Sequence, residues 1–251
     1  MKQWQKYLAE LLGTFVLVFG GSLAILAYRG GSGVDVAVVA FGFGLSLLAG
    51  LYAFGEVSGG HFNPAVSLAM FLDRRLTALE TIWYWISQFV GAILASLVIL
   101  ATFASTNDVG KTANVSNADW RNFVVEIVLT AIFVAVILQV TRSTTYRAQA
   151  LVAIPLTLAA VHFAGVGVSS TGVNPARSFA PVLLSGDHWG DIWLFILGPA
   201  IGAIVGWAAH MVTVRGDTTL KGDLARAASD MRSVDMSDLR EGPGGGAPPA
   251  S

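Results

Sequence analysis

The sequence predicts an all-α membrane protein with six transmembrane helices and two re-entrant half-helices arranged as an inverted repeat. Three observations lead to this fold class. Hydrophobic residues make up 54% and charged residues 12% of the 251 residues, whereas an average soluble domain carries roughly 25% charged residues. Six apolar stretches are long enough to cross a bilayer. The tripeptide Asn-Pro-Ala occurs twice, each time at the start of a shorter apolar stretch.

The lengths of the apolar stretches separate spanning helices from half-helices. A transmembrane helix needs about 20 mostly apolar residues. The six stretches of this length are Leu8–Tyr28, Val36–Phe54, Thr81–Phe103, Phe123–Thr141, Ala150–Val168 and Ile192–Val214. Two pieces of about half that length, Pro64–Leu72 and Pro175–Leu184, are too short to span and are expected to re-enter the membrane or lie at its surface.

The first stretch follows a basic opening, as a secretory signal would. It lacks a convincing small-residue cleavage site and further apolar spans follow it. We therefore expect a retained first membrane helix.

The cations orient the bundle. With six spans both termini lie on one side of the membrane, and that side then holds eleven Lys and Arg residues against three on the other. The positive-inside tendency predicts cytoplasmic termini in a multi-pass protein of the cell (inner or plasma) membrane. The eleven are Lys2, Lys6, Arg74, Arg75, Arg142, Arg147, Arg215, Lys221, Arg226, Arg232 and Arg240, and the three are Arg29, Lys111 and Arg121.

The two halves of the chain resemble each other. Each places one carboxylate early in an apolar span and later delivers an Asn-Pro-Ala. Glu10 and Glu126 are 116 positions apart, and Asn63 and Asn174 are 111 apart. Each unit has three spans and one half-span, so the second copy enters the membrane upside down, and special sites are expected at the midplane where the copies meet.

Glu10 and Glu126 are costly at membrane depth and are functional or structural candidates for that reason. As a proton relay they would make the chain a transporter. As structural groups they would accept hydrogen bonds from N–H groups of the re-entrant loops, which lack helical partners. Because the pair is symmetric and lies beside irregular loops, we favour the role of loop-supporting carboxylates.

Asn63-Pro64-Ala65 and Asn174-Pro175-Ala176 are expected to begin the half-helices, since Asn is a strong N-cap and Pro suits the first helical turn. In an inverted repeat the two helix N-termini face each other, each carrying about half a positive charge. The Asn amides donate to a passing water, which then points its own hydrogens outward. Such half-helix dipoles and donors exclude protons and cations from a pore.

Other functional classes have little support. A net charge of −1 without dense Lys/Arg clusters argues against nucleic-acid binding, and the absence of cysteine excludes disulfides and thiolate chemistry. The four histidines, His61, His162, His188 and His210, show no short ligand spacing. We expect no metal site, no cofactor and no catalytic residues, because no nucleophile–base constellation stands out.

The segments GGHFNPAVSLA and GVNPARSFAP resemble the paired motifs of the aquaporin (major intrinsic protein) family, closest to its bacterial water-selective members. The resemblance covers almost everything except the C-terminal tail. It implies an aquaporin-like fold with one pore per subunit, a homotetramer in the lipid bilayer, and water as the permeant. The expected channel domain is 1–216, with repeat 1 at about 1–104 and repeat 2 at about 120–216. Residues 217–251 are polar, end in a Gly/Pro/Ala run, and are expected to be a disordered cytoplasmic tail.

Counting from the motifs, the family's aromatic/arginine selectivity filter falls on Phe43, His162, Thr171 and Arg177. This set resembles the water-selective branch. Glycerol facilitators tend to carry glycine in place of His162, an aromatic residue near Thr171, and Asp in place of Ser178. His162 and Arg177 narrow the pore and offer polar groups to a single water, whereas glycerol needs a wider slot with an apolar wall.

Three functions stay open at this point. The first is a water channel, the second a facilitator of glycerol or another small neutral solute, and the third an inverted-repeat secondary transporter that uses Glu10 and Glu126. Val182, Phe195 and Glu56 depart from the usual water-channel pattern. They leave open both a leak of small neutral solutes and a role of Glu56 at the cytoplasmic mouth.

Overall fold

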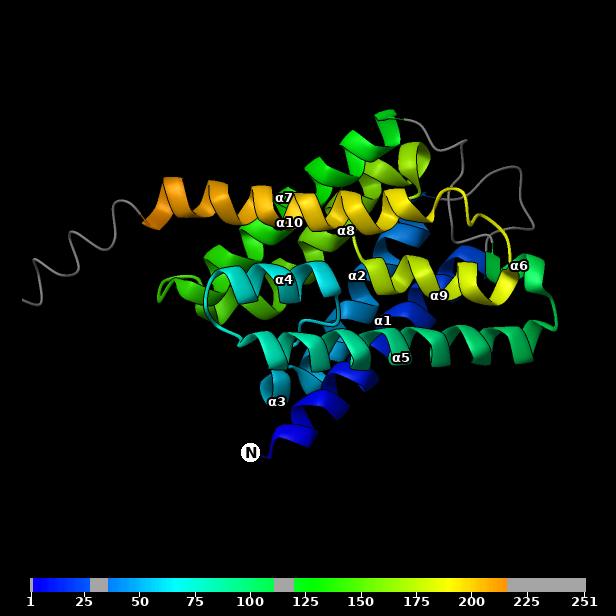
Figure 1. Cartoon of the computed structure of the whole chain (residues 1–251), viewed down its shortest axis with the longest axis horizontal. Helices are drawn as coiled ribbons and strands as arrows, with labels where there is room; N and C mark the ends of the chain where they lie inside the picture. Colours follow the sequence, from blue (N-terminus) through cyan, green and yellow to red (C-terminus); the bar gives the residue numbers. More distant parts are fainter. Residues whose placement is uncertain (1, 28–35, 111–119, 216–251) are drawn as a thin grey trace, which may run out of the picture. The chain divides into compact units, whose positions relative to one another are not determined.

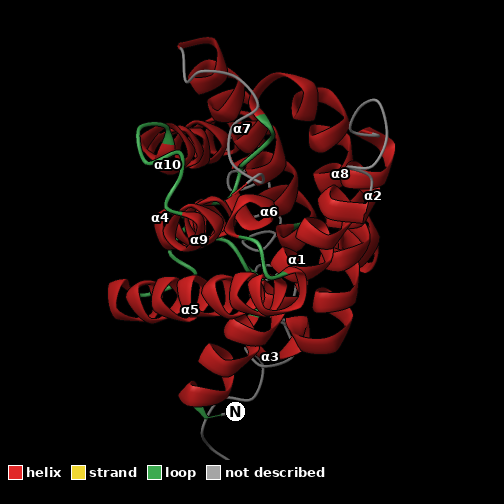
Figure 2. Cartoon of the chain, turned by 90° about the vertical axis from the view of Figure 1, so that its right-hand side faces the viewer, coloured by secondary structure: helices red, strands yellow, loops and turns green. Residues whose placement is uncertain are grey.

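The computed structural model describes residues 2–27, 36–110 and 120–215. Within these ranges it contains helices and no strand, which confirms the all-α prediction (Figures 1 and 2). The elements are α1 (Gln3–Ala27), α2 (Val36–Gly50), η1 (Leu51–Gly55), α3 (Glu56–Ser58), α4 (Pro64–Leu72), α5 (Ala78–Phe103), α6 (Thr106–Gly110), α7 (Trp120–Arg142), η2 (Arg147–Gln149), α8 (Ala150–Ser169), α9 (Pro175–Ser185), α10 (Ile192–His210) and η3 (Met211–Arg215).

Among the described residues, six helical stretches are long and apolar enough to cross a membrane, and each coincides with a predicted span. The structure extends several of them by about one turn. Helix α5 begins at Ala78 rather than at Thr81 because Thr77 and Glu80 form a capping box, in which each side chain bonds the other's backbone N–H. Tyr28, where the first span was expected to end, lies outside the described residues.

The second span contains a change of helical pitch that the apolar pattern does not reveal. Helix α2 passes into a π-helical turn at Leu51–Gly55 before the short helix α3. Gly59 and Gly60 follow with φ of 96° and 66°, a left-handed conformation that glycine adopts at no steric cost. These features turn the chain out of the span and into the first re-entrant loop.

The two half-length helices lie in line with each other in the interior (Figures 1 and 2). Helix α4 has the predicted bounds, and α9 is one residue longer than predicted. Asn63 and Asn174 cap them from extended backbone, with φ of −158° and −148°. Because Asn63 bonds the residue directly before Asn174, the two N-termini meet and the helices run in opposite directions.

The long helices pack in two equivalent sets. Helix α1 contacts α2 and α5, while α7 contacts α8 and α10, and α2 meets α8 between the sets. Each half-helix packs on the last long helix of the other set, α9 on α5 and α4 on α10. This exchange is the arrangement expected of an inverted repeat.

Glycine allows the closest helix crossings. A Cβ at Gly91 of α5 would clash with the carbonyl oxygen of Leu11 in α1, and one at Gly202 of α10 would clash with that of Ile127 in α7. Small residues let membrane helices approach backbone to backbone in this way. Gly91 and Gly202 are separated by the same 111 positions as the two Asn residues, so both repeats use the same crossing.

The outer faces of the long helices are apolar. Exposed side chains include Phe41 and Leu45 on α2, Ile86 on α5, Ile132 on α7 and Leu197 on α10. Soluble proteins rarely expose apolar surface so widely. The described helices therefore match a multi-pass membrane protein whose solvent is lipid.

Met1–His210 forms one compact unit, and Met211–Ser251 separates from it as a second. Of the second unit the structure describes Met211–Arg215, a π-helical turn. The tail predicted at residues 217–251 lies outside the described residues, as do Arg29 and Lys111.

Candidate functional site

The first re-entrant loop is held by Glu10 of α1, which is fully buried. Its Oε1 accepts hydrogen bonds from the Ser58 hydroxyl (2.6 Å) and from the N–H of His61 (3.0 Å). Its Oε2 accepts from the N–H of Phe62 (2.7 Å) and from Nε2 of Gln88 (2.7 Å). One carboxylate thus satisfies two backbone donors that have no helical partner, which membrane burial demands.

Glu126 of α7 holds the second loop in the same way and is also fully buried. It accepts from the Ser169 hydroxyl (2.6 Å) and from the N–H groups of Gly172 (2.8 Å) and Val173 (2.7 Å). These three partners stand 111 positions after Ser58, His61 and Phe62. The hydrogen bonds therefore repeat with the sequence.

Both loops hold strained backbone directly before the half-helices. Phe62 and Val173 have φ of 49° and 42°, and Ser170 and Thr171 have φ of 63° and 51°. Such conformations cost of order 1–3 kcal/mol for residues other than glycine. The carboxylate hydrogen bonds offset this cost and fix the direction of the carbonyl groups before each Asn.

The two Asn residues join the loops reciprocally. Nδ2 of Asn63 donates to the carbonyl of Val173 (2.8 Å), and Nδ2 of Asn174 donates to the carbonyl of Phe62 (2.9 Å). Each Oδ1 caps its own half-helix, on Ala65 (2.8 Å) in the first and on Ala176 (3.1 Å) in the second. An amide carries two N–H hydrogens, so each Asn keeps a second hydrogen beyond these bonds.

A narrow cavity runs past both Asn side chains. Its volume is about 20 Å³, and a single water needs at least roughly 10–15 Å³. Its polar lining consists of His61, Asn63, Asn174, His162, Arg177 and the backbone of Gly172, and its apolar lining of Leu17, Leu47, Phe133, Leu158, Val173 and the ring of Phe43.

Three of the four expected filter residues surround this cavity. The rings of Phe43 and His162 stack with centroids 4.5 Å apart, and Cζ of Arg177 lies 4.7 Å from the centroid of Phe43. All three are almost completely buried. Thr171 is also buried but is not among the lining residues, because its side chain packs towards Gly165 of α8.

The hydrogen bond of His162 assigns its tautomer. Nδ1 lies 2.8 Å from the carbonyl of Leu158, which can only accept, so Nδ1 carries the hydrogen. Nε2 has no hydrogen-bond partner among the described residues. In the neutral ring this atom is a hydrogen-bond acceptor, and His162 lines the narrow cavity together with Arg177.

Sequence reasoning missed the apolar wall. Leu17 and Phe133 are separated by 116 positions, as Glu10 and Glu126 are, and Leu47 and Leu158 by 111. Comparing every apolar position of the first repeat with the position 111 or 116 residues later would have identified these pairs as equivalent. The periodicity of an almost uniformly apolar helix could not have done so.

The described residues offer no group of three or more His, Asp or Glu side chains able to hold a metal ion. The carboxylates of Glu10 and Glu126 instead accept hydrogen bonds from the loops, and Arg177 lines the narrow cavity. This arrangement can orient a small polar molecule but contains no nucleophile paired with a base.

Comparison with known proteins shows relatives over nearly the whole described chain. Residues 1–210 match the family described as MIP, Major intrinsic protein. Glycerol uptake facilitator protein-like 6 of Lactiplantibacillus plantarum is 38% identical over 218 residues, covering 84% of this chain and 98% of the relative. Aquaporin Z of Photorhabdus laumondii is 40% identical over 220 residues, covering 80% and 94%.

A solved structure shares the fold. The X-ray structure of the aquaglyceroporin from Plasmodium falciparum superposes with a TM-score of 0.70 at 20% sequence identity, covering 85% of this chain and 97% of that one. At this identity the likeness bears on the fold alone.

Proposed function

Since this chain belongs to the major intrinsic protein family, whose members are passive channels and not enzymes, we propose that it conducts water down osmotic gradients while excluding protons and ions. The observation that carries the proposal is the cavity of about 20 Å³ beside Asn63, Asn174, Phe43, His162 and Arg177. It has room for about one water, which supports water over the larger glycerol as the proposed permeant.

The proposed path uses the Asn pair as donors. Both Asn side chains line the cavity, and in this proposal the second N–H of each amide donates to the water that passes there. Nε2 of His162, which has no partner among the described residues, accepts a hydrogen bond from a water in the same cavity. A water whose oxygen accepts from both amides cannot also accept a proton from a neighbouring water, so protons are not relayed past this point. The N-terminal dipoles of α4 and α9 add a positive potential that repels cations.

The filter would act through shape and charge. Arg177 supplies a buried positive charge beside the stacked rings of Phe43 and His162, and Pro64, Ala65, Pro175 and Ala176 start the half-helices that form the constriction. In this proposal Thr171 acts through its backbone and its packing, since its side chain does not line the narrow cavity.

A second candidate is facilitation of glycerol or another small neutral solute. It is favoured by the relative named as a glycerol uptake facilitator-like protein. A secondary transporter has less support, because Glu10 and Glu126 accept seven hydrogen bonds between them from side chains and loop N–H groups of the described residues. Carboxylates committed in this way are poor proton carriers.

Assembly and orientation belong to the same proposal. We propose a homotetramer with one pore per subunit, both termini in the cytoplasm, and a channel domain of 1–216 with repeats at about 1–104 and 120–216. Arg142 and Arg121 lie at opposite ends of α7. Arg142 lines one cavity together with Lys6, Arg75 and Arg147 of other elements. Such a concentration of cations at one end of the bundle is expected of a cytoplasmic face.

Stopped-flow light scattering of reconstituted vesicles tests the choice of permeant. In a sucrose gradient, vesicles with the protein should shrink about tenfold faster than empty ones, which corresponds to a barrier lower by about 1.4 kcal/mol. In a glycerol gradient they should shrink equally fast and then re-swell no faster than empty vesicles. Re-swelling at a rate near that of water entry would establish the glycerol reading instead.

A further inference from the structure

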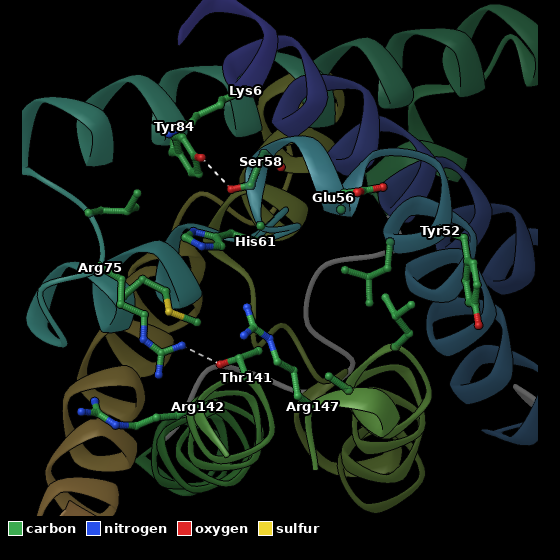
Figure 3. Close-up of a pocket in the computed structure, with 17 residues that line it drawn as sticks. Lys6, Tyr52, Glu56, Ser58, His61, Arg75, Tyr84, Thr141, Arg142 and Arg147 are labelled. Carbon is green, nitrogen blue, oxygen red and sulfur yellow. Dashed lines mark hydrogen bonds between the residues drawn. The ribbon is translucent and has the colours of Figure 1, made fainter. Parts of the chain in front are cut away.

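A wide vestibule opens beside the narrow pore. Its volume is about 920 Å³, and His61 lines both this vestibule and the narrow cavity. The charged side chains that line it are Lys6, Arg75, Arg142, Arg147 and Glu56 (Figure 3). A molecule held among them would lie at the entrance of the pore.

Three of the four cations that line the vestibule form ion pairs within the described chain, with two carboxylates in total. Lys6 pairs with Glu80 at 3.7 Å. The buried carboxylate of Asp73 binds both Nε of Arg75 (2.7 Å) and Nη1 of Arg142 (3.4 Å). Two arginines thus bind the same carboxylate on this side of the vestibule.

Arg147 adds a cation that nothing in the described chain neutralises. It is exposed and lies in η2, and its side chain forms no hydrogen bond or ion pair with the described residues. Figure 3 shows its guanidinium pointing into the vestibule, between His61 and Thr141. Glu56 is the one carboxylate among the described lining residues, and it points away from the arginines (Figure 3).

We propose that this vestibule binds a phosphate-type oxyanion through Arg147, within the positive field of Arg75 and Arg142. A guanidinium presents paired N–H donors that match two phosphate oxygens. The ligand is the free phosphate group of a small metabolite or the phosphate headgroup of an anionic lipid. Bound there, the anion occupies the space in front of His61 and lowers water conductance, a consequence that rests on the proposed function.

Direct binding is the first test. Inorganic phosphate, titrated at constant ionic strength onto the full-length protein in detergent, should bind wild type in calorimetry. Arg147→Gln should weaken this binding about tenfold, or by about 1.4 kcal/mol, because it removes a charged donor. Glu56→Gln should strengthen it, since it removes the one opposing charge. Arg121→Gln is the matched control, because Arg121 is an exposed cation at the other end of α7.

Water permeability then separates the two sources of phosphate. Vesicles of neutral lipid should lose permeability when inorganic phosphate is present on both sides, if the ligand is a soluble anion. If it is a lipid, phosphatidic acid in the vesicles should lower permeability and soluble phosphate should not. In either case Arg147→Gln should abolish the effect and Arg121→Gln should retain it.

Two results would overturn the proposal. One is the absence of phosphate binding to wild type together with permeability that neither soluble phosphate nor phosphatidic acid changes. The other is an equal response of Arg147→Gln and wild type. Should wild-type vesicles show no water permeability above empty ones while phosphate still binds through Arg147, the anion site stands and the proposed permeant is wrong.

Discussion

Glu126→Ala is expected to destabilise the protein by about 3 kcal/mol or more and to abolish most water permeability. It leaves the Ser169 hydroxyl and the N–H groups of Gly172 and Val173 without their acceptor. Each unsatisfied buried donor costs about 1–3 kcal/mol. The loop that it releases positions Asn174 and Arg177, so the filter loses its geometry together with its stability.

Thermal unfolding in detergent and stopped-flow permeability, measured on the same preparation, check this result. Glu126→Gln keeps one acceptor oxygen and should fall between wild type and alanine. Glu80→Ala is a control carboxylate in the capping box of α5, where the loss of its exposed hydrogen bonds to Thr77 is expected to cost about 0.5–1.5 kcal/mol. If Glu126→Ala unfolds like wild type yet loses water permeability, Glu126 acts in permeation itself and its role as a loop support is wrong.

His162→Gly combined with Thr171→Phe is expected to admit glycerol. Removing the imidazole takes away the ring that stacks on Phe43 and narrows the cavity beside Arg177. Glycerol can then keep hydrogen bonds that it would otherwise lose at about 1–3 kcal/mol for each hydroxyl. Its permeability should therefore rise about tenfold or more.

The single variants sharpen this prediction. His162→Gly should cause most of the gain, because the side chain of Thr171 does not line the narrow cavity. His188→Gly, at a histidine that does not line the cavity, is the matched control and should leave glycerol permeability at the level of empty vesicles. Glycerol permeability that stays unchanged in a folded, water-conducting double variant would reject the filter assignment.

The sequence predicted best where signals are local. Helix α4 begins and ends at the predicted residues because Asn63 and Pro64 mark its start without ambiguity. Helix α5 begins three residues early because the capping box at Thr77 lies in polar sequence that a hydropathy pattern ignores. The spans themselves follow from length and apolar content alone, which are the properties that a bilayer imposes.

Long-range geometry was beyond the sequence. The bond from Asn63 to Val173 joins residues 110 positions apart, and only the meeting of the half-helices makes it possible. The π-helical turn at Leu51–Gly55 leaves no trace in apolar periodicity. The repeat offsets did contain the pairing of Leu17 with Phe133, but nothing in a uniformly apolar helix shows which face lines the pore.

Proton flux measured beside water flux tests the central claim most directly. Vesicles containing a trapped pH-sensitive dye report proton entry under a pH gradient, and the same vesicles report water flux in sucrose. The facing helix N-termini and the two Asn amides predict water flux well above that of empty vesicles with proton flux equal to theirs. Proton flux that rises in proportion to water flux would contradict the account.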